Sequence, residues 1–295
     1  MKRIKIIANP SSGREGAVDI LKKLIAPFSR MGASLLLEFT RHHGDAEAFA
    51  ARDDGEDCII AMGGDGTVNQ VVNGLYAEKR NVPLAVYPAG TVNDFAEYLK
   101  IPKDPIEFVS MVERGHVVPV DLGLCGDRAF INVCAAGLFT ELGYSVSDAS
   151  KSSMGRLAYY LEGIRSFRVK DLSREYFRVR LETADGTVEK KVMLVMVSNS
   201  SSIGGFSRIS PAASIKDGLL EVIAIEEMPF PKMIELITAI GVGKHTEHEH
   251  FLYFKTDKVT ISADRALRID IDGEPGPHLP QTVEVVAGGV PMIIN

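Results

Sequence analysis

The sequence predicts an α/β fold of two domains, an N-terminal α/β domain followed by a mainly β domain. Over the first 118 residues, short apolar runs alternate with helical patterns, whereas after Val117-Val118-Pro119 the runs are mostly strand-like. The length of 295 residues is also about twice that of a common single domain. We therefore expect residues 1–118, joined by about 289–295, to form one domain and residues 119–288 the other.

Strands and helices alternate in the first domain. Strands are expected at 3–8, 34–39, 57–62 and 83–87, and helices at 15–31, 45–53, 68–78, 93–99 and 105–114. In the helix at 68–78, apolar residues recur at the i, i+3, i+4 and i+7 spacing of a buried helix face; they are Val68, Val71, Val72 and Leu75. Strands joined by helices of this length form a parallel sheet that is covered on both faces.

The second domain is dominated by strand patterns. They cover 128–134, 176–183, 188–198, 219–226, 258–263, 267–272 and 282–287, with helices only near 152–166 and 230–242. Asp185-Gly186 lies between two of these runs and is typical of a tight hairpin turn. A β sandwich is the expected architecture.

Composition excludes some classes of protein. Hydrophobic residues make up 45% and charged residues 24%, which is typical of a folded globular chain. The net charge of −6 argues against a nucleic-acid partner, because such proteins neutralise many phosphates with Lys and Arg. No run approaches the ~18 apolar residues of a membrane-spanning helix, and the apolar run near the N-terminus is too short for a signal peptide.

The cysteines indicate a reducing compartment. Cys58, Cys125 and Cys134 are odd in number and show no C-x-x-C spacing, so we expect them to be reduced and buried in a cytoplasmic protein.

A glycine-rich turn follows the third predicted strand. Gly63-Gly64-Asp65-Gly66-Thr67 joins that strand to the helix at 68–78. Backbone without side chains lets phosphate oxygens reach the amides, and a helix N-terminus adds unpaired N–H groups. A simple turn capped by Asp65 or Thr67 is the alternative. No G-x-x-x-x-G-K-[ST] motif occurs, which disfavours a P-loop NTPase.

Two more turns follow the first and fourth strands. They are Asn9-Pro10-Ser11-Ser12-Gly13 and Pro88-Ala89-Gly90-Thr91-Val92-Asn93-Asp94. Open α/β sheets bind ligands at the carboxyl ends of their strands, so three such loops on one edge predict a nucleotide site. Taken singly, each is better explained as an ordinary capped turn.

These segments occur in the order of the nucleotide-domain motifs of bacterial diacylglycerol kinases, and the chain resembles that family. The matching segments are Asn9-Pro10-Ser11-Ser12-Gly13, residues 63–69 with Asn73-Gly74-Leu75, and residues 90–96. In the second domain they are Asp121-Leu122-Gly123, Asn132, Ala136-Gly137, residues 214–222 and Asp272-Gly273-Glu274. The resemblance covers nearly the whole chain, although the Gly-Gly-Asp-Gly core is shared with NAD kinases.

The resemblance implies an ATP-binding site in the first domain. Its residues would be Asn9, Pro10, Ser11, Ser12, Gly13, Thr40, Gly64, Asp65, Gly66, Thr67, Val68, Asn69, Gln70 and Thr91. Asp65 would also act in catalysis by organising magnesium or the water around the phosphates. Gln70 departs from a glutamate that is often found in the family, which puts the contribution of this position in doubt.

The resemblance also implies that Glu274 is the proton acceptor and Asp272 its close companion. On the strand at 267–272, alternation places Arg268, Asp270 and Asp272 on one face. From the residues alone, a hairpin turn with solvated acids is the better explanation.

A structural magnesium ion is the last site that the resemblance implies. Its ligands would be Ser214, Asp217 and, through the backbone carbonyl, Leu219. The residues alone favour a turn at Asp217-Gly218. His245, His248 and His250 also suggest a metal, but this polar segment lacks a convincing fourth ligand, and we expect a solvated loop.

The activity implied is an ATP- and Mg²⁺-dependent lipid kinase that acts in the cleft between the two domains. The substrate would be a membrane lipid, diacylglycerol giving phosphatidic acid, collected by peripheral contact with the inner membrane face; a homodimer is also implied. Residues 150–180 carry eight Lys or Arg against three acids and are a candidate membrane-facing surface, although the residues alone favour an ordinary core-facing helix. The alternatives are an NAD kinase and a catalytically silent regulator that binds nucleotide or lipid.

Overall fold

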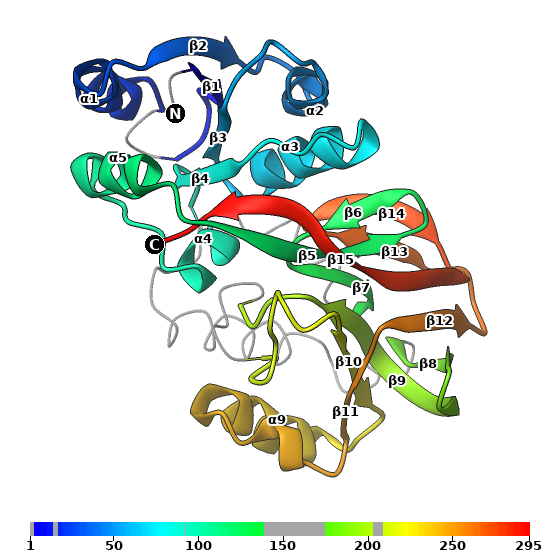
Figure 1. Ribbon diagram of the computed structural model, residues 1–295. Coiled ribbons are helices and arrows are strands. Elements are labelled where there is room, and N and C mark those ends of the chain that lie inside the picture. The colour runs from blue at the N-terminus through cyan, green and yellow to red at the C-terminus, as the bar shows by residue number, and fades with distance from the viewer. Residues whose placement is uncertain (1–2, 14–16, 92, 139–174, 203–208) are drawn as a thin grey trace. The chain divides into compact units, whose positions relative to one another are not determined.

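The computed structural model describes residues 3–13, 17–91, 93–138, 175–202 and 209–295 (Figure 1). The chain forms two compact units. Unit 1 comprises Met1–Leu122, Ala129–Ile131 and Val286–Asn295, and unit 2 comprises Gly123–Arg128 and Asn132–Val285. The domain boundaries predicted from the sequence were 118/119 and about 288/289. Unit 1 is therefore assembled from three stretches of the chain.

Unit 1 is built on a parallel sheet in the order β4-β3-β1-β2. Its strands are β1 (Arg3–Ala8), β2 (Ser34–Phe39), β3 (Cys58–Gly63) and β4 (Leu84–Pro88). The last part of β15 (Gln281–Ile293) joins beside β4, where Met292 pairs with Leu84. All six residues of β3 are buried, as expected of a central strand that is covered on both faces.

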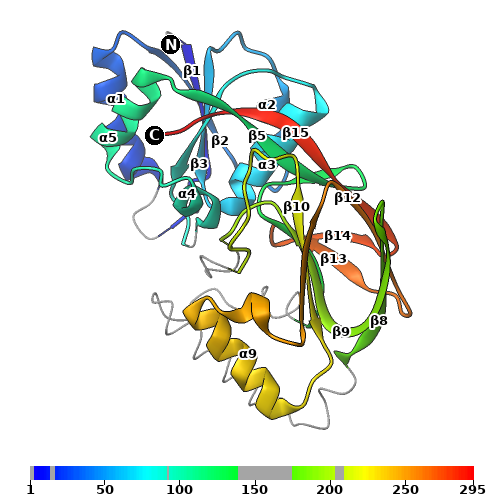
Figure 2. The ribbon, with the colours of Figure 1, turned by 60° about the horizontal axis from the view of Figure 1, so that its bottom comes forward.

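Helices cover both faces of this sheet, and the two views agree on their arrangement (Figures 1 and 2). On one face lie α1 (Ala17–Arg30) and α5 (Pro105–Arg114), and on the other α2 (Asp45–Ala51) and α3 (Asp65–Ala77). The short helix α4 (Asp94–Tyr98) follows β4. Sequence signals set the bounds of α5, because the Asp104 side chain accepts from the amides of Ile106 and Glu107, and Gly115 ends the helix in the left-handed conformation.

Unit 2 is antiparallel, with the order β14-β13-β7-β9-β8-β12-β15, while β10 pairs with β9 and β11. Its strands are β7 (Val133–Gly137), β8 (Phe177–Thr183), β9 (Gly186–Ser198), β10 (Leu220–Glu226), β11 (Phe251–Thr256), β12 (Lys258–Ala263), β13 (Arg268–Ile271) and β14 (Glu274–His278). β9 is shared, since its first half pairs with β8 and its second half lies between β7 and β10.

Among the residues of unit 2 that the structure describes, a helix packs on this sheet. Helix α9 (Phe230–Val242) contributes Met233, Leu236 and Ile237 to a core that also contains Ile223 and Phe251. Ile223 lies on β10 and Phe251 on β11, and these two strands pair with each other. Helix α9 therefore covers the edge of unit 2 that β10 and β11 form (Figure 2). A 3₁₀ turn, η1 (His245–Glu247), connects α9 to β11.

Most predicted elements are confirmed, and β1, β2 and α5 have the expected bounds. The Asp185-Gly186 hairpin is also confirmed, between β8 and β9. The sequence analysis missed β11, β14 and most of β5 (Val117–Cys125), and it merged β6 (Arg128–Phe130) with β7. The helix expected near 152–166 lies outside the described residues, as does most of the basic segment 150–180.

The three cysteines are free and buried, as expected. Cys58, Cys125 and Cys134 are all unbridged and buried, and burial raises the pKa of the Cys58 thiol to about 12. Among the helices that the structure describes, none is long and apolar enough to cross a membrane.

Candidate active site

The nucleotide residues predicted in unit 1 follow the carboxyl ends of its four parallel strands. Asn9 follows β1, Thr40 follows β2, Gly64 follows β3 and Thr91 comes shortly after β4. The amide of Asn9 donates to the Met62 carbonyl at 2.9 Å, and that of Thr40 donates to the Ala8 carbonyl at 3.0 Å. The structure therefore brings the predicted loops to one edge of the sheet, where open α/β folds bind ligands.

The loops after β3 and β4 are joined through their backbones. The Gly63 carbonyl accepts from the amides of Ala89 and Gly90, at 3.0 and 3.2 Å. A Cβ atom on Gly90 would lie 2.4 Å from the Cα of Gly64, a distance that real Cβ contacts do not reach. Only glycine permits this close packing of the two loops, backbone against backbone.

The loop at residues 9–13 contacts both of the others. The Asn9 side chain accepts from the Ser11 amide at 3.0 Å and lies 3.4 Å from the Thr67 hydroxyl at the start of α3. Gly13 has a φ of +71°, and a Cβ there would lie 2.1 Å from the Ala89 carbonyl oxygen. The three motif segments thus form one connected set of loops rather than three separate capped turns.

Asp65 connects two of these loops through its side chain. Its carboxylate oxygens accept from the amides of Asp94 at 3.0 Å and Phe95 at 3.1 Å, the first amides of α4. An aspartate 29 residues away in sequence therefore caps α4, satisfying donors that have no partner within the helix. The role in organising magnesium or phosphate-bound water stays a prediction.

The first turns of α3 serve both packing and the edge of the sheet. The side chains of Thr67, Val68 and Asn69 are buried, so Val68 can approach a ligand only through its backbone. The Asn69 and Asn73 side chains donate to the Ala129 carbonyl at 3.0 and 2.9 Å, which ties residues 129–131 to unit 1. The amides at the start of α3 give this edge a positive end suited to an anion.

Gln70 holds the start of α2. Its side-chain oxygen accepts from the Gly44 amide at 3.0 Å, and Gly44 is the residue immediately before α2. A glutamate at this position can accept the same hydrogen bond and would add a negative charge. Glutamine in place of glutamate at position 70 therefore keeps the hydrogen bond from the Gly44 amide and lacks the negative charge.

The structure corrects the placement of Asp272 in unit 2. Asp272 and Gly273 have φ values of 51° and 88°, and they form the two-residue turn of a hairpin in which Ile271 pairs with Glu274. The expected hairpin is confirmed, but Asp272 is neither on the strand face with Arg268 nor solvated, since it is only 9% exposed. The turn directs its carboxylate inward.

The buried Asp272 carboxylate anchors this turn to β7. One oxygen accepts from the amides of Asn132 at 2.9 Å and Val133 at 2.8 Å, while the Asp272 amide donates to the Val133 carbonyl. The Asn132 side chain in turn accepts from the Ser200 hydroxyl at 2.8 Å. Glu274, the first residue of β14 and partly exposed, is thus held next to a rigid turn.

The remaining predicted sites lie elsewhere in unit 2. Ser214, Asp217 and Leu219 belong to the loop before β10, and both Asp217 oxygens are engaged, one by the Leu219 amide at 3.2 Å and the other by Lys255 at 2.8 Å. In the part of the chain that the structure describes, no group of three His, Cys, Asp or Glu side chains has an arrangement suited to a metal.

The expectation of a solvated histidine loop is wrong for His245. Its ring is fully buried, lies 2.9 Å from the Ile209 carbonyl and packs edge-on against Phe251. The apolar residues that surround α9 enclose it, which the polar sequence around it did not indicate.

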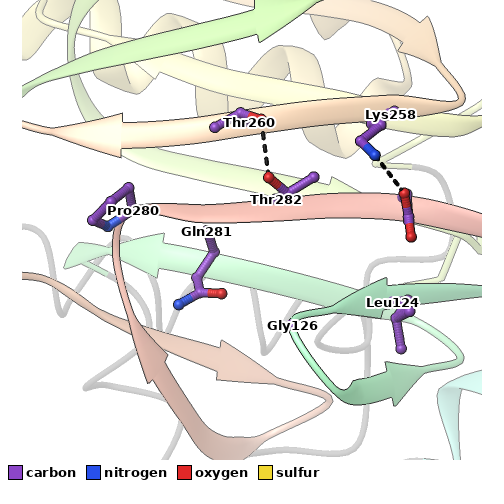
Figure 3. A pocket seen from close by; sticks show the side chains of 8 residues that line it. Leu124, Gly126, Lys258, Thr260, Pro280, Gln281 and Thr282 are labelled. Carbon is purple, nitrogen blue, oxygen red and sulfur yellow. Dashed lines mark hydrogen bonds and ion pairs between the residues drawn. The ribbon is translucent and has the colours of Figure 1, made fainter.

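A hollow of about 520 Å³ in unit 2 is lined by the paired strands β12 and β15, the end of β5 and the turn after it (Figure 3). Along this lining, Thr260 and Thr282 share a hydrogen bond of 3.0 Å, and Lys258 pairs with Glu284 at 2.8 Å. Its lining consists of Leu124, Gly126, Lys258, Thr260, Pro280, Gln281, Thr282 and Glu284. Among the lining residues there is no predicted site residue.

Known proteins match the chain across both units. Residues 3–125 match the model of the diacylglycerol kinase catalytic domain, and residues 134–294 match that of the YegS C-terminal NAD kinase beta sandwich-like domain. A diacylglycerol kinase of Bacillus subtilis strain 168 is 35% identical over 288 residues, which is 95% of this chain and 92% of that protein. The chain belongs to the diacylglycerol kinase family. The resemblance inferred from the motifs and the predicted fold class are therefore confirmed.

Further relatives agree. A diacylglycerol kinase of Staphylococcus aureus strain MRSA252 is 36% identical over 286 residues, covering 95% of this chain and 88% of that protein. A crystal structure of a diacylglycerol kinase from Bacillus anthracis strain Sterne superposes with a TM-score of 0.81 at 28% identity, covering 100% of this chain and 97% of that one. The similarity extends over nearly the full length of each protein.

Proposed function

We propose that the chain transfers the γ-phosphoryl group of ATP to the hydroxyl of a membrane lipid, with diacylglycerol as the substrate and phosphatidic acid as the product. The observation that carries this proposal is the identity of 35% to a diacylglycerol kinase over 95% of the chain, which includes the residues of both units. Membership in a kinase family implies a nucleotide phosphoryl donor, and ATP is the donor that we assign.

The loops of unit 1 fit the phosphates of ATP. Gly13, Gly64 and Gly90 let the loops pack closely together, and α3 begins at the same edge, where its first amides can meet a phosphate. Mg²⁺ that travels with ATP keeps several waters and is bound largely through the phosphates, so it requires few protein ligands. In this proposal Asp65 maintains the geometry of the loops, because both its oxygens hold the start of α4.

Glu274 of unit 2 serves as the proton acceptor. The lipid oxygen forms a bond to the γ-phosphorus, the bond between that phosphorus and the ADP oxygen breaks, and the hydroxyl proton passes to the Glu274 carboxylate. Asp272 acts as a positioning residue, since its contacts to Asn132 and Val133 fix the turn that precedes Glu274. One oxygen of its carboxylate accepts both of these hydrogen bonds.

Transfer of labelled γ-phosphate from ATP tests this function. Purified protein is incubated with Mg²⁺ and diacylglycerol in mixed micelles, and with a bacterial lipid extract. We expect one labelled lipid with the mobility of phosphatidic acid. Glu274→Gln is expected to lower kcat by about 100-fold or more, because general-base catalysis contributes that much. Glu284→Gln, a surface acid paired with Lys258, is the matched control and is expected to retain activity.

Other outcomes would favour other functions. Phosphorylation of NAD in the absence of lipid would indicate an NAD kinase, whose Gly-Gly-Asp-Gly loop this chain shares. ATP binding without turnover on any lipid would indicate a silent regulator. Peripheral membrane contact and a homodimer are part of the proposal, and vesicle flotation and sedimentation velocity measure them directly.

A further inference from the structure

The loop before β10 surrounds a positive charge that belongs to the protein itself. Lys255 lies on β11, directly opposite Glu221 of β10, and these strands run side by side (Figures 1 and 2). Its ammonium lies 2.6 Å from the Ala212 carbonyl oxygen, 2.8 Å from Asp217 Oδ2 and 3.1 Å from Glu221 Oε1. Two segments far from Lys255 in sequence thus meet at one cation.

The chemistry of this cluster is that of a small cation site. A backbone carbonyl and two carboxylates are the ligands that hard cations prefer. An ammonium has three N–H donors, and three oxygens from the loop before β10 and the start of β10 lie within reach of them. The contacts to Ala212 and Asp217 are directed hydrogen bonds, whereas the one to Glu221 is an ion pair without good hydrogen-bond alignment.

Charge and burial make Lys255 important to this loop. The Glu221 side chain is fully buried, and those of Asp217 and Lys255 are 30% and 28% exposed. Without the ammonium, the cluster would hold two carboxylates and a carbonyl with no positive charge among them.

The same loop carries the residues for which the family resemblance implied magnesium, namely Ser214, Asp217 and Leu219. Of these, Asp217 supplies the carboxylate, and its oxygens already bind the Lys255 ammonium and the Leu219 amide. A divalent ion at Asp217 would lie close to the ammonium and be repelled by it. The residues present therefore do not fit a magnesium ion while Lys255 is in place.

We infer that the Lys255 ammonium takes the place of a structural divalent cation at Asp217, so that this part of unit 2 keeps its structure without magnesium. The inference concerns the stability of unit 2 and is independent of the proposed lipid kinase activity. It makes two predictions that a metal site would not make. A chelator should leave the stability of the wild type unchanged, and a variant without the ammonium should be stabilised by a divalent metal ion.

Thermal unfolding without nucleotide tests both predictions. Wild type, Lys255→Met and Lys258→Met are melted in EDTA and in millimolar Mg²⁺ or Ca²⁺. We expect the wild-type Tm to be the same in each buffer. Lys255→Met is expected to lose several degrees in EDTA and to regain part of this loss with a divalent ion, which the freed oxygens then bind. Lys258→Met, an exposed paired lysine on β12, controls for the loss of a surface charge.

A second variant identifies the site. Lys255→Met combined with Asp217→Asn is expected to show no response to either metal. A wild-type Tm that falls in EDTA, and no longer does so in Asp217→Asn, would overturn the inference. A Lys255→Met protein that is destabilised but not rescued would also overturn it, because the oxygens would then hold only an ammonium. If Lys255→Met does not fold, calorimetric titration of Mg²⁺ into wild type and Asp217→Asn decides, since equal binding supports the inference and Asp217-dependent binding refutes it.

Discussion

Lys5 in unit 1 and Lys255 in unit 2 occupy similar clusters but have opposite relations with their carboxylates. Lys5 is fully buried on β1, where it hydrogen-bonds the carbonyls of Phe49 and Arg52 and lies 2.7 Å from Asp54. Lys255 likewise binds a carbonyl and lies close to carboxylates, including Glu221 at 3.1 Å. Each lysine joins separate segments of its unit.

The pKa values of the Asp54 and Glu221 carboxylates are shifted in opposite directions. Hydrogen bonds from Arg52 and Lys5 lower the pKa of Asp54 to about 2. Burial raises the pKa of Glu221 to about 7, against the opposing attraction of the nearby Lys255 ammonium. A neighbouring lysine therefore does not by itself decide the pKa of a carboxylate. The burial of the carboxylate and the hydrogen bonds that it accepts also contribute.

The largest effect is expected from Lys5→Met. The variant removes a fully buried ammonium that the Phe49 and Arg52 carbonyls share with the Asp54 carboxylate, so the free energy of unfolding should fall by about 3–5 kcal/mol. Urea unfolding followed by far-ultraviolet circular dichroism measures it, a suitable probe because the chain has no tryptophan. Lys22→Met is the control, because its pair with Asp19 is exposed and should change stability little. Equal losses for both variants would contradict the role of burial.

An intermediate, pH-dependent effect is expected from Glu221→Gln. Between its ordinary pKa of 4.5 and about 7, Glu221 binds more protons in the folded than in the unfolded chain, so wild-type stability falls as pH rises through this window. The variant lacks this loss. Its stability relative to wild type should therefore rise by about 2–3 kcal/mol from pH 4.5 to pH 7, as measured by urea unfolding.

A constant difference between Glu221→Gln and wild type over this pH range would show that Glu221 stays ionised. Glu284→Gln supplies the baseline, since that glutamate forms an exposed ion pair with Lys258.

The smallest effect is expected from Asp54→Asn, with the opposite sign. The lowered pKa means that Asp54 contributes stability above its ordinary value of 3.8 and loses it as pH falls toward 2. Because Asp54 is a quarter exposed, the variant should be about 1 kcal/mol less stable at pH 7. The difference should close on acidification to pH 2. A gap that persists at pH 2 in urea titrations would assign it to something other than charge.

The regular elements of unit 1 were predictable because local patterns determine them. Continuous apolar runs such as β3 and the capped helix α5 carry their bounds in the sequence. The strand β14 was missed because Glu274–His278 contains two prolines and a glycine, which an edge strand tolerates but which are more typical of turns. The aromatic residues of β11 favour a strand, so the sequence does carry a signal for this element.

The candidate site was predictable as a set of residues but not as a set of contacts. The glycines marked the loops, yet nothing local indicates that Asp65 caps α4 or that Asp272 binds the amides of Asn132 and Val133. Such contacts join residues far apart in the chain and exist only once the strands have paired. The pairing of Glu221 with Lys255 depends on strand register in the same way.

The path of β15 has a consequence for biosynthesis. Its early residues pair with β12 of unit 2, but Met292 completes the sheet of unit 1 beside Leu84. A ribosome that has made the first 122 residues has therefore not yet supplied the strand segment that pairs with one edge of β4. The edge of β4 therefore gains this pairing only when almost all of this sequence has emerged, and a premature stop codon near residue 285 would remove a strand segment from unit 1.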